Sequence, residues 1–142
     1  MLYALFLLLG VNEQVIETLM KSMCFSEFLD LDTININDLI FELGLFDNKK
    51  ITTMITTILR ERHSKEDMTL KELYELTNIK LTAKVCNSTK SCVEYISYEN
   101  EPDISINLLL QMTTAIPFFF KPITYKDNVY VDGGCAGGFA TE

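Results

Sequence analysis

The sequence of 142 residues contains no tryptophan, one histidine, three prolines and six glycines. It is also short of positive charge, with 12 Lys and Arg against 20 Asp and Glu and a net charge of −8. Because the basic residues are scattered, no basic stripe is available to neutralise phosphates, which argues against a nucleic-acid partner. Hydrophobic residues make up 48% of the chain and charged residues 23%, a composition typical of a globular domain.

The sequence also lacks the ligand spacing of a metal site. The four cysteines, Cys24, Cys86, Cys92 and Cys135, form no C-x-x-C pair, and the single histidine, His63, has no partner at ligand spacing. Zinc sites are built from such clusters, so no metal site is expected. The pattern instead favours four free thiols in a reducing compartment, while two disulfides stay open for a secreted chain. His63 is expected to be a solvated helix residue.

The longest apolar run is too short to span a membrane. Residues 1–11 (MLYALFLLLGV) end at Asn12 and Glu13, whereas a spanning helix needs about 20 apolar residues. A secretory signal would carry a basic start and a small-residue cleavage site, and both are missing. The run therefore predicts a helix buried on every side in a larger α/β domain, with a secretory signal as the alternative. The sequence does not identify the compartment, and an intracellular location, either cytoplasmic or peripheral to a membrane, is favoured.

Helical periodicity dominates the first half of the chain, and strand-like alternation appears in the second. Asn12 is placed to cap one helix, and Thr69 with Glu72 fits a capping box at the start of another. The further expected helices are 35–43, 51–59, 69–76 and 104–114, and the expected strands are 81–85, 93–98 and 129–131. This order predicts a layered α/β domain with some of its sheet missing.

Four segments carry a resemblance to a known family. The last is Thr113–Gly134 (TTAIPFFFKPITYKDNVYVDGG), where a small-residue helix end precedes Ile-Pro, aromatic residues, a second proline, a turn and Tyr-Val-Asp-Gly-Gly. Before it come Met1–Gly10, Phe25–Leu29 and Met68–Asn87, the last with a helix, a Glu-Leu-Thr turn and a strand. The ordered set covers almost the whole chain and resembles the patatin-like phospholipases.

The resemblance implies a three-layer α/β/α domain that hydrolyses acyl esters of lipids. In that family a serine on a G-x-S-x-G turn attacks the ester, an aspartate accepts the serine proton, and a glycine-rich loop stabilises the oxyanion. The position that matches the aspartate is Asp132, and Gly133 and Gly134 match the glycines of the adjoining turn. The resemblance implies no cofactor and no metal, and a lipid substrate in a micelle or at a membrane surface.

The family's nucleophile has no counterpart in this sequence. No serine stands between two glycines at the G-x-S-x-G spacing, and Ser88 and Ser91 fall in an expected hairpin turn. By the resemblance, the serine would fall a few residues before Met1. Residues 1–142 are therefore expected to form a partial patatin-like domain without its first strands and nucleophile turn. Such a chain is expected to be inactive alone and to self-associate through open sheet edges.

Other interpretations stay open from the sequence. A catalytically inactive remnant that contacts proteins or lipids is the alternative to a hydrolase. For Phe118–Phe120, core packing around two prolines is favoured over an acyl-chain pocket or a membrane contact. Cys135 has no basic neighbour and is expected to be a plain turn residue rather than a reactive thiol. Residues 135–142 lack the Asn and Pro residues usual in the family, which leaves the support of the Asp132 turn open.

Overall fold

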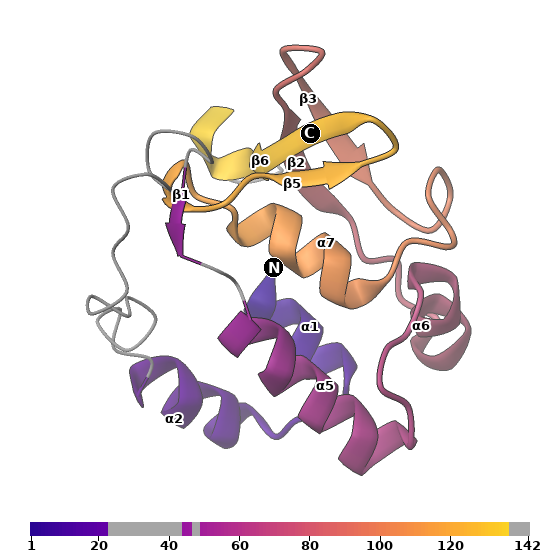
Figure 1. The fold of residues 1–142 in the computed structure, drawn as a ribbon. Helices are drawn as coiled ribbons and strands as arrows, with labels where there is room; N and C mark the ends of the chain where they lie inside the picture. The colour runs from indigo at the N-terminus through magenta and orange to yellow at the C-terminus, as the bar shows by residue number, and fades with distance from the viewer. Residues whose placement is uncertain (23–43, 47–48, 137–142) are drawn as a thin grey trace.

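A computed structural model describes residues 1–22, 44–46 and 49–136 (Figure 1). The elements in chain order are α1 (Leu2–Leu8), α2 (Glu13–Ser22), β1 (Gly44–Phe46), α5 (Lys49–His63), α6 (Leu70–Thr77), β2 (Ala83–Asn87), β3 (Cys92–Ile96), α7 (Ile106–Thr114), β4 (Phe118–Phe120), β5 (Ile123–Tyr125), β6 (Asn128–Asp132) and the 3-10 helix η2 (Gly133–Ala136). The predicted helix 35–43, the segment Phe25–Leu29, Cys24 and residues 137–142 lie outside the described residues.

Four strands form an antiparallel sheet in the order β3-β2-β6-β5, and β1 and β4 form a separate parallel pair. In the four-stranded sheet, Asn87 of β2 pairs with Tyr130 of β6, and Val85 pairs with Asp132. Because side chains alternate between the two faces of a strand, these four residues share one face. The same face packs on α7 through a cluster that includes Val85, Tyr130 and Leu109 (Figure 1). This α/β arrangement confirms the predicted fold class.

A second cluster of buried side chains joins α1, α2, α5 and α7. Its members include Phe6 of α1, Leu59 of α5 and Leu110 of α7. Within this chain the first helix is not buried on every side, because Tyr3 is 37% exposed and Leu7 is 46% exposed. Its burial in a larger α/β domain stays a prediction. Only one side of α1 faces the cluster, so the helix has a buried face and an exposed face despite its uniformly apolar sequence.

Both predicted helix caps are confirmed. The Asn12 side chain accepts a hydrogen bond from the N–H of Gln14 at 2.9 Å. The Thr69 hydroxyl accepts from the N–H of Glu72 at 3.2 Å, and the Glu72 carboxylate accepts from the N–H of Thr69 at 2.9 Å. Thr69 also forms an antiparallel bridge with Ser105, the residue that caps α7. The starts of α6 and α7 are therefore held side by side.

We expect Thr69→Ala to lower the free energy of unfolding by about 1 kcal/mol, because it removes the hydroxyl that accepts a backbone N–H at the start of α6. Urea denaturation followed by circular dichroism measures the change. Thr57→Ala is the matched control, since Thr57 is an exposed residue within α5 that bonds only its own helix. The control should be neutral or slightly stabilising. Equal losses in the two variants would contradict a capping role.

The other predicted helices and strands within the described residues are present, but their first and last residues differ from those predicted. β2 and β3 form the expected hairpin, but β2 extends to Asn87, which the sequence assigned to the turn. The expected helix 104–114 begins at Ile106. β4 and β5 were not predicted, because Pro117 and Pro122 indicated broken structure. Each of these strands is only three residues long and fits after one of the prolines.

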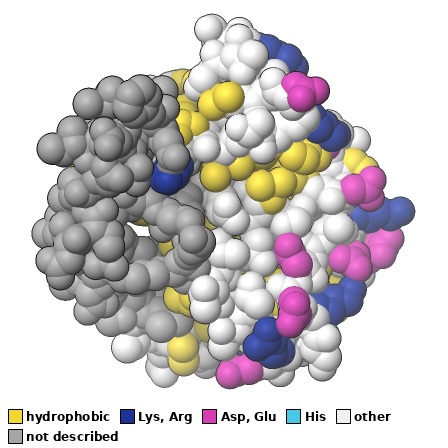
Figure 2. Space-filling view, viewed as in Figure 1, with side chains coloured by type: hydrophobic (Ala, Val, Ile, Leu, Met, Phe, Trp, Pro, Cys, Tyr) yellow, Lys and Arg dark blue, Asp and Glu magenta, His cyan; other side chains and the backbone are white. Residues whose placement is uncertain are grey.

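The face shown in Figure 2 carries charges of both signs. Figure 2 shows acidic and basic side chains interspersed along one side of the face in view. Among the residues that the structure describes, no helix is both long and apolar enough to cross a membrane.

Candidate functional site

Asp132 is the last residue of β6, and the chain turns sharply after it into η2. Its backbone N–H donates to the carbonyl of Ala115, just after α7, at 3.0 Å. Its carboxylate oxygen Oδ1 accepts a hydrogen bond from the N–H of Gly134 at 2.9 Å. The other oxygen, Oδ2, makes no hydrogen bond to the described part of the chain. The structure therefore orients the carboxylate through one oxygen and leaves the second available.

The two glycines after Asp132 have different roles. Gly133 is buried, and a Cβ at this position would lie 2.3 Å from the carbonyl oxygen of Lys84. Only glycine fits such a close approach of two backbone segments. A Cβ at Gly134 would come no nearer than 3.4 Å, to Oδ1 of Asp132. Gly133 thus lets η2 close on β2, while Gly134 provides the N–H that orients the carboxylate.

The other nucleophile candidates are poorly placed. Cys135 is exposed, but partial desolvation and the charge of Asp132 raise the pKa of its thiol, so the reactive thiolate is disfavoured. This direction agrees with a plain turn residue. Ser88 and Ser91 follow β2 in the hairpin turn, where the N–H of Ser88 donates to the carbonyl of Val129. Neither serine stands on a turn between a strand and a helix.

The aromatic run divides between core and surface. Phe120 is 4% exposed, whereas Phe118 is 67% and Phe119 is 40% exposed. Core packing is therefore right for Phe120 and wrong for the other two. The reason is local, because Phe118 has a φ of +71° and this left-handed conformation interrupts the alternation of a regular strand. His63, expected to be solvated, ends α5 in a partly buried position.

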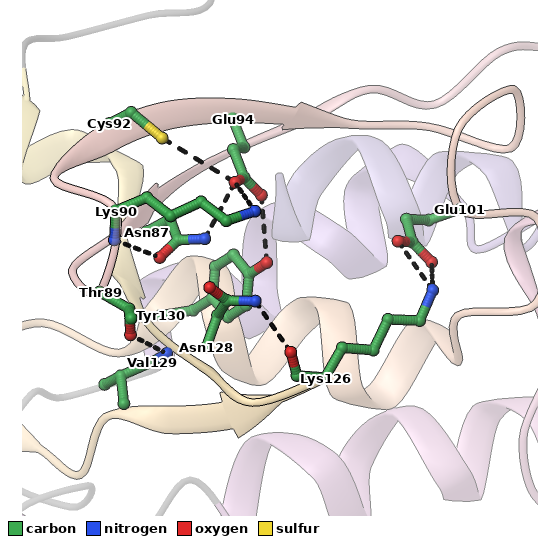
Figure 3. A network of polar contacts seen from close by, with 10 residues as sticks. All are labelled: Asn87, Thr89, Lys90, Cys92, Glu94, Glu101, Lys126, Asn128, Val129 and Tyr130. Carbon is green, nitrogen blue, oxygen red and sulfur yellow. Dashed lines mark hydrogen bonds and ion pairs between the residues drawn. The ribbon is translucent and has the colours of Figure 1, made fainter.

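A polar network across three strands was missed by the sequence analysis (Figure 3). Glu94 of β3 accepts hydrogen bonds from the Asn87 side chain at 2.9 Å and from the Tyr130 hydroxyl at 3.1 Å. Burial, together with the hydrogen bond to Glu94, raises the pKa of Tyr130 to about 12, so its hydroxyl stays protonated at neutral pH. The network links β6, which ends at Asp132, to β2 and β3. Asn87 and Glu94 are polar residues at strand positions on the face that packs on α7, and this pattern was the signal that could have revealed the network.

Within residues 1–22, 44–46 and 49–136, no group of three or more His, Cys, Asp or Glu residues is placed to hold a metal ion. Cys86, Cys92 and Cys135 are free thiols in the structure.

Comparison with known proteins connects this geometry to a family. Residues 2–142 match the family model described as patatin-like phospholipase. The chain belongs to the patatin-like phospholipase family. The family predicted from the ordered motifs is thus confirmed. In this patatin-like chain, the Asp-Gly-Gly turn ends β6 and contacts both the end of α7, through Ala115, and β2, through Lys84.

A viral protein resembles this patatin-like chain along much of its length. The probable lipid hydrolase 463L of Invertebrate iridescent virus 6 is 33% identical to it over 111 residues. The match covers 78% of this chain and 38% of the viral protein, so the chain spans well under half the length of that relative. No solved structure matches the chain. The family and this relative support a resemblance to lipid hydrolases.

Proposed function

We propose that this chain provides the aspartate-bearing part of a patatin-like lipid acyl hydrolase. The observation that carries the proposal is the Asp132 carboxylate, with Oδ1 held by the N–H of Gly134 and Oδ2 free of hydrogen bonds to the described residues. A general base needs a fixed orientation and an oxygen that can accept a proton. The family supports acyl-ester hydrolysis, and the printed name of the viral relative supports a lipid substrate.

In the proposed reaction, a serine hydroxyl attacks the ester carbonyl carbon and its proton passes to Asp132 Oδ2. The proton then goes to the departing alcohol, and the acyl group stays on the serine. Water then attacks the acyl carbonyl carbon and gives a proton to the carboxylate. The bond to the serine oxygen breaks, the proton passes from Asp132 to that oxygen, and the fatty acid leaves with the serine hydroxyl and the carboxylate restored. Residues 1–142 contain no G-x-S-x-G serine, so we assign the nucleophile and the oxyanion loop to a segment on the N-terminal side of these residues.

The 142-residue chain alone is expected not to react with a fluorophosphonate probe and not to hydrolyse a nitrophenyl ester. The reason is that Ser88 and Ser91 occupy a hairpin turn without the helix N-terminus that activates a nucleophile elbow. Gel fluorescence and intact-mass spectrometry measure labelling, with an active serine hydrolase as the positive control. Stoichiometric labelling of either serine would overturn this part of the proposal.

The second candidate is a catalytically inactive module that contacts lipids or proteins. Exposure of the Phe118 and Phe119 rings favours it, because exposed aromatic pairs are suited to apolar contacts. The coding DNA upstream of Met1 distinguishes the two candidates. An open frame through G-x-S-x-G and a glycine-rich loop supports the hydrolase, whereas a stop codon supports the inactive module.

We also propose that residues 1–142 form a partial domain and self-associate when isolated. The outer strands of the described sheet, β3 and β5, present backbone N–H and C=O groups that can pair with another copy. Sedimentation velocity is expected to show species that grow with protein concentration. A monomer at every concentration, with one cooperative unfolding transition, would contradict this expectation.

A further inference from the structure

A small cavity opens beside the polar network of β3 and β6. Its volume is about 210 Å³. Sites for drug-sized ligands usually enclose about 300 Å³ or more, so this cavity suits a smaller chemical group. Its polar and aromatic lining residues are Glu94, Tyr95, Asn100, Glu101, Tyr125 and Tyr130.

Two tyrosine–glutamate pairs line the cavity. The Tyr130 hydroxyl donates to Glu94 at 3.1 Å, and the Tyr125 hydroxyl donates to Glu101 at 3.0 Å. Both carboxylates are largely withdrawn from solvent, with side chains that are 29% and 26% exposed. Burial and the neighbouring glutamates raise the pKa of both tyrosines, so their hydroxyls remain neutral donors at neutral pH. Partly buried carboxylates beside aromatic rings favour a cation.

An ammonium group of the protein itself already contacts this lining. The Lys126 amine lies 2.9 Å and 2.7 Å from the two carboxylate oxygens of Glu101 (Figure 3). It also lies 5.2 Å from the centre of the Tyr125 ring. The Lys126 side chain is 62% exposed, so it reaches Glu101 from the solvent side. At Glu94, the Lys90 amine approaches only to 3.6 Å. The Lys126 contacts therefore show that this lining accepts a primary ammonium group. Because the Lys126 side chain is exposed, a ligand can displace it.

We propose that this cavity, which Glu94, Glu101 and Tyr125 line, binds a primary ammonium group, such as that of an ethanolamine head group, at Glu101 and the Tyr125 ring. A primary ammonium has three N–H donors for the carboxylates and a positive charge for the ring face, as Lys126 demonstrates. The cavity volume admits a small head group but not an acyl chain. Tyr130 stands two residues before Asp132, so the assignment of this ammonium group to a lipid substrate rests on the proposed function. The binding of an ammonium group as such does not rest on it.

Ethanolamine titration of the whole chain, followed by backbone amide chemical shifts, tests the site. Saturable shifts at Tyr125 and Tyr130 in the millimolar range are expected for so small a ligand. Lys126→Met should tighten binding about three- to tenfold because it removes the internal competitor, and Glu101→Gln should weaken binding about tenfold. Glu99→Gln is the matched control, because Glu99 is an exposed glutamate outside the lining and pairs with Lys80.

Choline separates recognition of N–H donors from recognition of charge alone. It has no N–H groups on nitrogen and is expected to bind more weakly than ethanolamine. The proposed site would be overturned by any one of three results: equal affinity for choline, unchanged binding in Glu101→Gln, or no saturable shifts in Lys126→Met. Because the Lys126 side chain is exposed, its replacement should not disturb folding, so the last result could not be attributed to a folding defect.

Vesicles separate a lipid head group from a soluble amine. Stronger binding to phosphatidylethanolamine than to phosphatidylcholine vesicles, lost in Glu101→Gln, supports the head group. Binding of free ethanolamine without a vesicle preference keeps the ammonium site and overturns its assignment to lipid. Neither measurement needs hydrolysis, so failure of the proposed catalytic function leaves the result of this test unchanged.

Discussion

Asp132→Asn is expected to lower turnover by about 10³- to 10⁴-fold in a protein that joins residues 1–142 to an N-terminal segment with the family's G-x-S-x-G turn and glycine-rich loop. An asparagine cannot take the serine proton. It has nearly the same volume, however, and its amide oxygen can still accept the hydrogen bond that Gly134 donates to Oδ1. Hydrolysis of a nitrophenyl ester measures the loss, and thermal unfolding checks that the fold is kept.

Asp127→Asn is the matched control for this experiment. Asp127 lies exposed in the β5–β6 turn with a φ of +61°, a conformation that asparagine tolerates well. The same chemical change there should leave turnover intact. If Asp132→Asn retained activity while the fold was preserved, another residue would have to accept the serine proton.

Gly133→Ala is expected to lower the free energy of unfolding by about 2–4 kcal/mol. The added Cβ would lie 2.3 Å from the carbonyl oxygen of Lys84 and 2.6 Å from its carbonyl carbon. Both are backbone atoms of β2, so no rotation of a side chain can relieve the overlap. Relief requires η2 to move away from β2, which disturbs the turn that follows Asp132. Urea denaturation measures the change.

Gly134→Ala tests whether the overlap, rather than reduced backbone freedom, causes this loss. Its Cβ would meet Oδ1 of Asp132 at 3.4 Å, an ordinary contact distance. We expect a change below about 1 kcal/mol. Similar losses of stability in the two variants would indicate that close packing on Lys84 is not the reason why residue 133 must be glycine.

Local features of the fold could be predicted from the sequence. The capping box needs only Thr69 and Glu72, which stand three residues apart, so both partners are visible in one segment. The β2–β3 hairpin likewise joins two segments that are close in the sequence, and the sequence predicted correctly that they form an antiparallel pair around a turn. The family could be predicted because its motifs occur in order along the chain, and Asp132 could be singled out through that order.

Features that depend on distant partners could not be predicted in this way. Asn87 is typical of a turn, and its place as a buried strand residue depends on Glu94 and Tyr130 from two other strands. The sequence does not reveal the exposed side of α1, since Leu7 is chemically no different from the buried Leu5 two residues before it. Which of two leucines is buried depends on how α1 packs on other helices.

The bridge between Thr69 and Ser105 closes part of the chain into a loop. The N–H of Leu70 donates to the carbonyl of Ile104 at 3.0 Å, and the N–H of Ile106 donates to the carbonyl of Met68 at 2.8 Å. The chain thus leaves and returns at one point, with α6, β2 and β3 between. Two pieces cut within the β2–β3 turn would still meet at the bridge and along the hairpin ladder. We therefore expect the chain to tolerate a cut or an inserted segment in that turn.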